Sequence, residues 1–233
     1  CLVNLKNCAD MQGTLFDLEL PTTSKSAPPP ENVVVQWSFS RRNVLETCPR
    51  KYYYQYYAGG QEKRGSPKTL DSIRFLKMLS NKYLVLGKIV HNLIRLHFTH
   101  CKPLNTLKWM VSDTLKQSID FSLNYQSGDE KRYKYPPQLL QEVFWGDENY
   151  RTTYQEVEEK ACLALQNFCE YEAFKDLLEG GKQPNALIEK KFKIEFGKEI
   201  KITGEPDLAF GTDDEFIIAD WKTGKIDDVN DSK

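Results

Sequence analysis

The chain has 233 residues, with 32 basic and 33 acidic side chains, and 40% of its residues are hydrophobic. This is an ordinary globular composition, and the near-zero net charge excludes a generally basic nucleic-acid coat while allowing a local binding face. No apolar run approaches the roughly 18 residues that a spanning helix needs, which argues against a membrane protein.

The first 32 residues are predicted to form a disordered tail and a proline-rich linker. Four prolines mixed with serine and threonine between Leu20 and Asn32 favour extended, poorly packed backbone. Ahead of them, Gln12 to Phe16 reads Q-x-x-L-F, which resembles the short peptides that hold bacterial DNA-processing proteins on the replication sliding clamp. A plain disordered tail is the alternative, because such a segment buries little apolar surface alone. We expect one folded domain over 33–233.

Most of the next 150 residues are predicted to be helical. Ser38 or Ser40 can cap a first helix that ends at a glycine pair, Gly59-Gly60. A break is expected near Ser80, and a connecting segment with short helical pieces over 126–149. The helices expected from capping residues and apolar spacing are 38–57, 71–100, 104–125 and 150–179.

After Pro184 the pattern changes to alternating apolar and polar residues between turn signals, which predicts a three-stranded antiparallel meander over 186–223. If the last turn centres on Asp213-Asp214, Asp207 lies opposite Asp220 and Glu205 lies opposite Lys222, and all four side chains share one face. A three-residue or five-residue loop would place the two aspartates on opposite faces.

Two carboxylates and an ammonium on one strand face suit phosphodiester hydrolysis. Directly opposite residues have Cβ atoms roughly 4.5–5.5 Å apart, close enough for Asp207 and Asp220 to hold one cation. Mg²⁺ binds through one or two carboxylates and phosphate oxygens, and Lys222 could orient water or stabilise developing charge. The alternative is a surface salt bridge between Asp220 and Lys222 on an edge strand.

Gly204-Glu205-Pro206-Asp207 is followed by Asp220-Trp221-Lys222-Thr223-Gly224. Together with two upstream landmarks in the right order, these motifs resemble the PD-(D/E)xK nuclease superfamily, in particular its RecB-type and CRISPR-associated exonuclease branch. Upstream, Ser38-Phe39-Ser40 with Cys48-Pro49-Arg50-Lys51-Tyr52-Tyr53 resembles the branch's N-terminal helix, and Gly87 to His91 resembles its G-x-x-x-H helix. The resemblance spans about Ser38 to Gly224.

The resemblance implies an α/β, restriction-endonuclease-like core: a mixed sheet containing the antiparallel meander, flanked by helices and preceded by a large helical portion. It also implies that Asp207 and Asp220 bind Mg²⁺ or Mn²⁺, that Lys222 is the catalytic lysine, and that His91 and the Trp221 carbonyl add ligands. Without the family, His91 would be read as a core residue. Glu189 could support the metal through water, or be a solvated strand charge.

The function implied is a metal-dependent DNA nuclease, an exonuclease of repair, recombination or CRISPR adaptation acting on single strands or duplex ends, with a helicase or CRISPR adaptation partner. The alternatives are a non-catalytic DNA-binding or scaffolding module of a helicase–nuclease complex, and an RNA-directed or restriction-type nuclease. Members of the family continue with a further helix after the lysine motif, so the nuclease domain is expected to be C-terminally incomplete.

Cations interleaved with tyrosines over 41–57 suit a strand-binding surface, in which charges meet phosphates and rings meet unstacked bases. We expect DNA contacts from Arg41, Arg42 and Lys51, with the tyrosines mostly in the core. In some members of the branch a cysteine at the position of Cys48 helps to hold a [4Fe–4S] cluster, expected here only in a longer parent chain. Six scattered cysteines without C-x-x-C spacing, and no secretory signal, predict a cytoplasmic protein.

Overall fold

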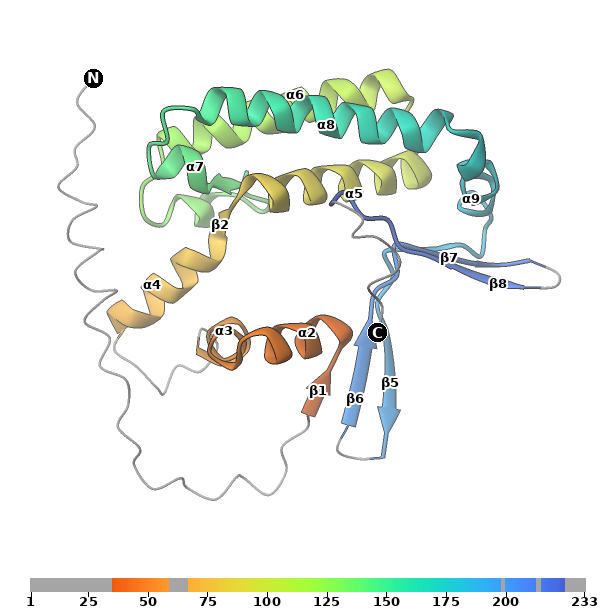
Figure 1. Ribbon diagram of the computed structural model, residues 1–233, viewed down its shortest axis with the longest axis horizontal. Helices are drawn as coiled ribbons and strands as arrows, with labels where there is room; N and C mark the ends of the chain where they lie inside the picture. The colour runs from red at the N-terminus through yellow and green to blue at the C-terminus, as the bar shows by residue number, and fades with distance from the viewer. Residues whose placement is uncertain (1–34, 59–66, 198–199, 213–214, 225–233) are drawn as a thin grey trace. The chain divides into compact units, whose positions relative to one another are not determined.

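The computed structural model describes residues 35–58, 67–197, 200–212 and 215–224, whose helices and strands are labelled in Figure 1. The described residues divide into two compact units. The first unit comprises the described residues up to Met78 together with Phe192–Gly204, and the second comprises Leu79–Lys191 and the residues from Glu205 onward. The predicted tail and linker, the clamp-like peptide Gln12 to Phe16 and the turn residues Asp213 and Asp214 lie outside the described residues.

The first unit combines a small mixed sheet with helices. In the sheet, β6 lies between β1, to which it is parallel, and β5, to which it is antiparallel. A mixed sheet was expected, whereas β1 was not foreseen as a strand. The elements of this unit are β1 (Val35–Trp37), α2 (Phe39–Thr47), α3 (Pro49–Tyr53), the π-helical turn η1 (Tyr54–Ala58), α4 (Pro67–Met78), β5 (Phe192–Phe196) and β6 (Ile200–Gly204).

The predicted helix over 38–57 is divided into α2, α3 and η1. Ser38 caps α2 as expected, because its Oγ accepts a hydrogen bond from the Arg41 backbone N–H at 3.2 Å. Pro49 disfavours helical backbone at the residue before it, and Cys48 is accordingly extended, with φ −160°. The helix restarts there, with the Cys48 Sγ accepting from the Lys51 N–H at 3.4 Å.

The second unit is mostly helical, and its core lies between the long helices α5, α6 and α8 and the strand β7. The expected break near Ser80 is present, and Asn81 caps α5 through a hydrogen bond from the Leu84 N–H. The elements are β2 (Leu79–Ser80), α5 (Lys82–His100), α6 (Leu104–Leu123), η2 (Asp129–Arg132), β3 (Leu139–Leu140), α7 (Gln141–Phe144), α8 (Tyr150–Glu170), η3 (Glu172–Phe174), α9 (Lys175–Gly180), β4 (Leu187–Ile188), β7 (Leu208–Gly211) and β8 (Phe216–Ala219).

No helix in the described ranges is long and apolar enough to span a bilayer. The prediction that the segment before Pro184 is mostly helical is confirmed, and the predicted fourth helix ends at Glu170, after which the chain continues in η3 and α9. The segment 126–149 contains η2, the two-residue strand β3 and α7, as expected of a connection with short helical pieces.

The second sheet has the order β4-β7-β8, and all its pairings are antiparallel. The predicted register of its last two strands is confirmed, because Leu208 pairs with Ala219 and Phe210 with Ile217. The central strand β7 is buried along Leu208, Ala209 and Phe210, which is typical of a strand covered on both faces.

The predicted meander is wrong as one continuous sheet. Its first strand is divided into β4 and β5, and its second into β6 and β7, so that the pairs fall in two sheets. The β4–β7 and β5–β6 pairs nevertheless keep one common register, interrupted at 189–191 and 205–207. Two residues explain the interruption: Glu189 has a left-handed backbone, with φ 45°, and Pro206 has no N–H to donate to a ladder.

Candidate metal centre

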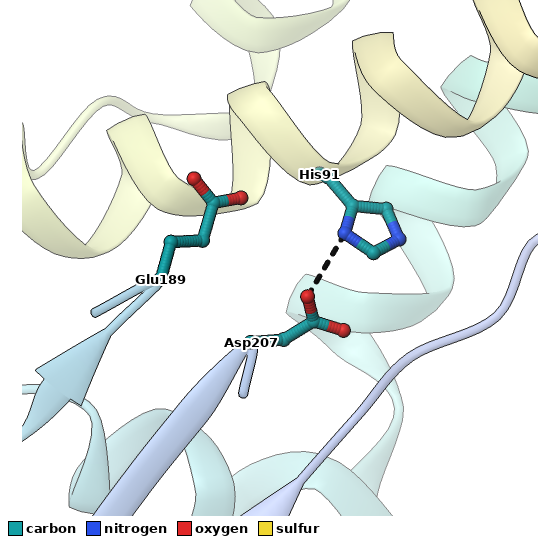
Figure 2. Close-up of side chains that lie close together, drawn as sticks. All are labelled: His91, Glu189 and Asp207. Carbon is teal, nitrogen blue, oxygen red and sulfur yellow. Dashed lines mark ion pairs between the residues drawn. The ribbon is translucent and has the colours of Figure 1, made fainter. Parts of the chain in front are cut away.

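Three side chains from three different elements converge in the second unit at the interruption of the sheet. His91 comes from α5, Glu189 follows β4 and Asp207 precedes β7 (Figure 2). One ligand atom from each residue, a ring nitrogen of His91 and a carboxylate oxygen of the other two, lies within 4.8 Å of the others. Such a group of one nitrogen and two oxygens could hold a divalent cation.

Asp207 is the buried member of the group, with 6% of the residue exposed. Its Oδ1 lies 3.0 Å from the His91 Nδ1, and its Oδ2 accepts a hydrogen bond from the Trp221 N–H at 2.8 Å. Its backbone carbonyl accepts from the Glu189 N–H at 3.1 Å. The carboxylate is therefore held by α5 and by the chain after β8, and the Asp207 backbone is held by the residue after β4, so that the orientation of the side chain is fixed.

The charges of the site act on one another. Burial alone raises the pKa of Asp207, but the hydrogen bonds from His91 and from the Trp221 N–H outweigh it and hold the pKa below its usual value. The hydrogen bond to Asp207 in turn raises the pKa of His91, although burial opposes this shift. The two shifts have one cause, because the hydrogen bond between Asp207 and His91 favours the carboxylate on one side and the protonated imidazole on the other.

Glu189 is held in place by Arg95, which lies one helical turn after His91 on α5. The Arg95 Nε lies 3.0 Å from the Glu189 Oε2. Burial raises the pKa of Glu189 in spite of the nearby positive charges of Arg95 and His91. A left-handed backbone at a residue other than glycine is uncommon and is often found at functional sites.

The sequence allows two interpretations of Glu189, a residue that supports the metal through water or a solvated charge on a strand. The structure brings its carboxylate into the group with His91 and Asp207. The observed register of β5 with β6, in which Phe192 pairs with Gly204, continues to Glu189 opposite Asp207. A two-residue turn over 197–198 would instead have set Glu189 opposite Pro206, so the sequence alone did not place Glu189 beside Asp207.

Asp220 and Lys222 follow β8, and the Asp220 carboxylate forms an ion pair with the Lys222 ammonium. The β7–β8 ladder makes Asp207 and Asp220 the next residues after its last pair, Leu208 and Ala219. The described structure does not bring Asp220 into the three-residue group, and its side chain is 51% exposed.

Trp221 lies between these two residues and points into the core. Its ring packs on Phe168 with a centroid distance of 5.3 Å and lies 6.3 Å from the His91 ring. Its backbone N–H binds Asp207, as described above, so Trp221 ties the end of β8 to the centre. Thr223 passes close to α5, where a Cβ on Gly87 would lie 3.5 Å from its Oγ1.

Comparison with known proteins decides the family. The sequence matches the family model of the PD-(D/E)XK nuclease superfamily over residues 36–232. The chain belongs to this superfamily. No curated protein and no solved structure gives a significant match. The PD-(D/E)XK superfamily consists in general of metal-dependent nucleases, so the predicted superfamily is confirmed, while the RecB-type and CRISPR-associated branch stays a prediction.

The donor set of this PD-(D/E)XK protein fits a divalent cation. Carboxylate oxygens and water suit Mg²⁺ and Mn²⁺, and a neutral imidazole nitrogen is a common additional ligand for transition metals. The carboxylate of Asp207 stays ionised because its pKa is low, as a ligand requires. His91, Glu189 and Asp207 are therefore the described residues that could hold a cation.

The predicted DNA-binding residues of this PD-(D/E)XK protein lie in the first unit. The Arg41 guanidinium stacks over the Tyr56 ring at 4.4 Å, Arg42 forms an exposed ion pair with Glu46 at 2.8 Å, and Lys51 is exposed. The expectation that the tyrosines are mostly core residues is wrong, because none of the five at 52–57 is buried. They form tilted ring pairs on the helix surface instead, such as Tyr52 with Tyr56.

Cys48 is a free cysteine in the described structure. Its sulfur caps α3, which gives the residue a local structural role in starting that helix after Pro49. The predicted [4Fe–4S] cluster of a longer parent chain stays a prediction.

Proposed function

We propose that this protein is a metal-dependent DNA nuclease whose active site is built around His91, Glu189 and Asp207, with Asp220 and Lys222 beside them. The observation that carries the proposal is the convergence of the His91 nitrogen and two carboxylate oxygens within 4.8 Å. This convergence stands at the strand ends that carry the PD-(D/E)XK motif, in a chain of that nuclease superfamily.

In this proposal each residue has a distinct role. A bound divalent cation supplies charge neutralisation at the scissile phosphate and a more acidic water. Asp207 and Glu189 provide its oxygen ligands, His91 adds a nitrogen ligand, and the Trp221 N–H keeps the Asp207 carboxylate aimed at the centre. Trp221 could also offer its backbone carbonyl, as the resemblance implies.

Lys222 is the proposed catalytic lysine. Its ammonium is held by Asp220, and the side chain is 72% exposed, so a phosphate can reach it. A fixed positive charge beside the scissile group stabilises the negative charge that builds on the phosphate oxygens in the transition state, and it can orient the attacking water. Asp220 is proposed to position this lysine and to add a carboxylate to the centre when a cation is bound.

DNA is the proposed substrate and cleavage from ends the proposed mode. The support is the sequence resemblance to exonucleases and the row of cations and accessible tyrosines over 41–57, which suits an unpaired strand. Roles in repair, recombination or CRISPR adaptation, a helicase or adaptation partner, a sliding-clamp contact through Gln12 to Phe16, and a cytoplasmic location stay predictions from the sequence.

The experiment compares the protein with Asp207→Asn and Lys222→Gln on end-labelled single-stranded and double-stranded DNA, with Mg²⁺, Mn²⁺ or EDTA. Asp113→Asn, which removes a carboxylate from α6, a helix that contributes no residue to the centre, is the matched control. We expect metal-dependent cleavage that both site variants reduce by at least about a hundredfold and the control leaves unchanged. A wild-type protein that binds DNA but never cleaves it would instead identify the non-catalytic binding module.

A further inference from the structure

A second polar cluster lies on α5 beside the proposed centre, and the nuclease chemistry described above does not use it. The Lys88 ammonium donates to the Gln138 Oε1 at 2.7 Å and to the Ser80 Oγ at 3.1 Å. Ser80 belongs to β2 and Gln138 directly precedes β3, and these two strands pair with each other. The flexible lysine is thus fixed at its charged end by two neutral oxygens on one small sheet.

This cluster and the proposed centre share one face of α5. Lys88 precedes His91 by three residues, which on an α-helix places it on a neighbouring position of the same face, about 4.5 Å away along the axis. Its neighbour Gly87 approaches Thr223, the residue after Lys222. Lys88 therefore lies within one helical turn of His91, on the helix that borders the proposed centre.

The charge of Lys88 is not neutralised within the described residues, since no carboxylate there lies within ion-pair distance of it. An ammonium has three N–H donors, and the two contacts with Ser80 and Gln138 leave one for a ligand. The residue as a whole is exposed, although its ammonium is partly covered, so a ligand can approach it from the solvent side. Partial burial lowers the pKa of Lys88, the direction expected for a cation whose neighbours are neutral.

We propose that Lys88, held by Ser80 and Gln138, binds a backbone phosphate of the substrate strand next to the scissile phosphate. This inference rests on the proposed nuclease function. A fixed ammonium that lacks a carboxylate partner and stands beside a phosphodiester-cleaving centre matches the charge and the acceptor oxygens of a phosphate.

The test measures binding of a short fluorescent DNA strand in EDTA, where no cleavage occurs, as a function of salt concentration. Lys88→Gln removes the charge, while Lys88→Arg keeps it. Gln138→Glu leaves Lys88 in place but gives it an internal carboxylate partner, which competes with a phosphate. Lys108→Gln is the matched control, because the Lys108 ammonium also donates to a glutamine oxygen, that of Gln166, at 2.9 Å, but between α6 and α8.

We expect Lys88→Gln and Gln138→Glu to weaken binding about three- to tenfold and to lower the salt slope by about 0.7, the value for one lost phosphate contact on a single strand. Lys88→Arg and Lys108→Gln should bind like the wild type. Strands with and without a 5′-phosphate locate the contact: equal losses assign it to an internal phosphodiester, and a loss confined to the phosphorylated strand assigns it to the terminal phosphate.

Two results overturn the inference. Unchanged affinity and salt slope for Lys88→Gln, in a protein that cleaves DNA, would remove Lys88 from the substrate path and leave the proposed nuclease intact. An equal loss of DNA affinity for Lys108→Gln would show that the loss in Lys88→Gln comes from the lower net charge and not from a specific phosphate contact. A wild-type protein that neither binds nor cleaves DNA with any metal would instead refute the proposed function itself. Thermal unfolding of each variant in the same buffer verifies that a loss of binding is not a loss of fold.

Discussion

We predict that Glu189 lowers the stability of the metal-free protein but strengthens metal binding. The Glu189→Gln variant tests these two effects separately. Burial raises the pKa of Glu189 above its unfolded value, with Asp207 adding to the shift and Arg95 opposing it. The folded state therefore disfavours the carboxylate: the stability contributed by the protonated form is present at acid pH and is lost as the pH rises through the folded pKa. At neutral pH an amide of the same shape avoids this cost.

The stability difference between Glu189→Gln and the wild type should be small without metal, and its sign should reverse when metal is bound. Glu189→Gln should raise the free energy of unfolding by about 0.5–1 kcal/mol in EDTA, because the Arg95 side chain is 38% exposed and its ion pair contributes little to offset the gain. At a metal concentration about a hundredfold above its dissociation constant, binding stabilises the wild type by about 2.7 kcal/mol. A tenfold weaker variant gains only about 1.4 kcal/mol.

Thermal unfolding with and without Mn²⁺ is the assay, at about 2–4 °C per kcal/mol for a chain of this size. The order of the two melting temperatures should invert when metal is added. Glu158→Gln is the control, because Glu158 is a half-buried glutamate on α8 that accepts a hydrogen bond from Ser112 and is not part of the three-residue group. The melting temperature of this variant should respond to metal like that of the wild type. A Glu189→Gln protein that is less stable than the wild type in EDTA, or that gains as much from Mn²⁺, refutes the reasoning.

Two further predictions concern the fold around the site. Gly180→Ala should lower stability by about 1–2 kcal/mol in a thermal melt, because the new Cβ would overlap the buried Phe210 ring and the overlap outweighs the better helix propensity of alanine; Gly211→Ala, with ordinary contacts only, should melt like the wild type. Burial and a hydrogen bond to Glu130 raise the pKa of Tyr125 to about 12, so the stability from its neutral phenol should be lost as the pH rises from 10 to 12. In Tyr125→Phe, the free energy of unfolding should depend less on pH between 10 and 12. An unchanged pH dependence would contradict the proposed role of the Tyr125 phenol.

Local chemistry in the sequence was enough to predict most helices and the register at the centre. Capping by Ser38, the break near Ser80 and the alternation after Pro184 each rest on interactions between residues close in the chain. The pairing of β7 with β8 followed from one turn position. These features are local, so the printed sequence contains them.

Other features depend on contacts between distant segments and were missed for that reason. The strand β1 forms because β6, about 165 residues later, offers it a parallel edge. The ion pair of Arg95 with Glu189 joins a helix to a strand end. The pattern of apolar and polar residues in the two segments does not predict this contact. The interruption at Pro206 was visible as a residue without an N–H, yet its effect on the sheet required the partner strand to be known.

The β4–β7 and β5–β6 pairs are separated by the interruption at 189–191 and 205–207. The hairpin β5–β6 therefore has the topology of an insertion between β4 and β7. Every residue proposed for metal binding or catalysis belongs to the second unit, and the chain leaves that unit after Lys191 and returns at Glu205. An ion pair of 3.7 Å already joins Lys191 to Glu205 across this opening. Lengthening or shortening the hairpin therefore changes a loop whose ends are held together, at a small entropic cost, and leaves Glu189 and Asp207 in register. The length and sequence of the hairpin can therefore change, in evolution or by engineering, while the residues of the metal centre keep their positions.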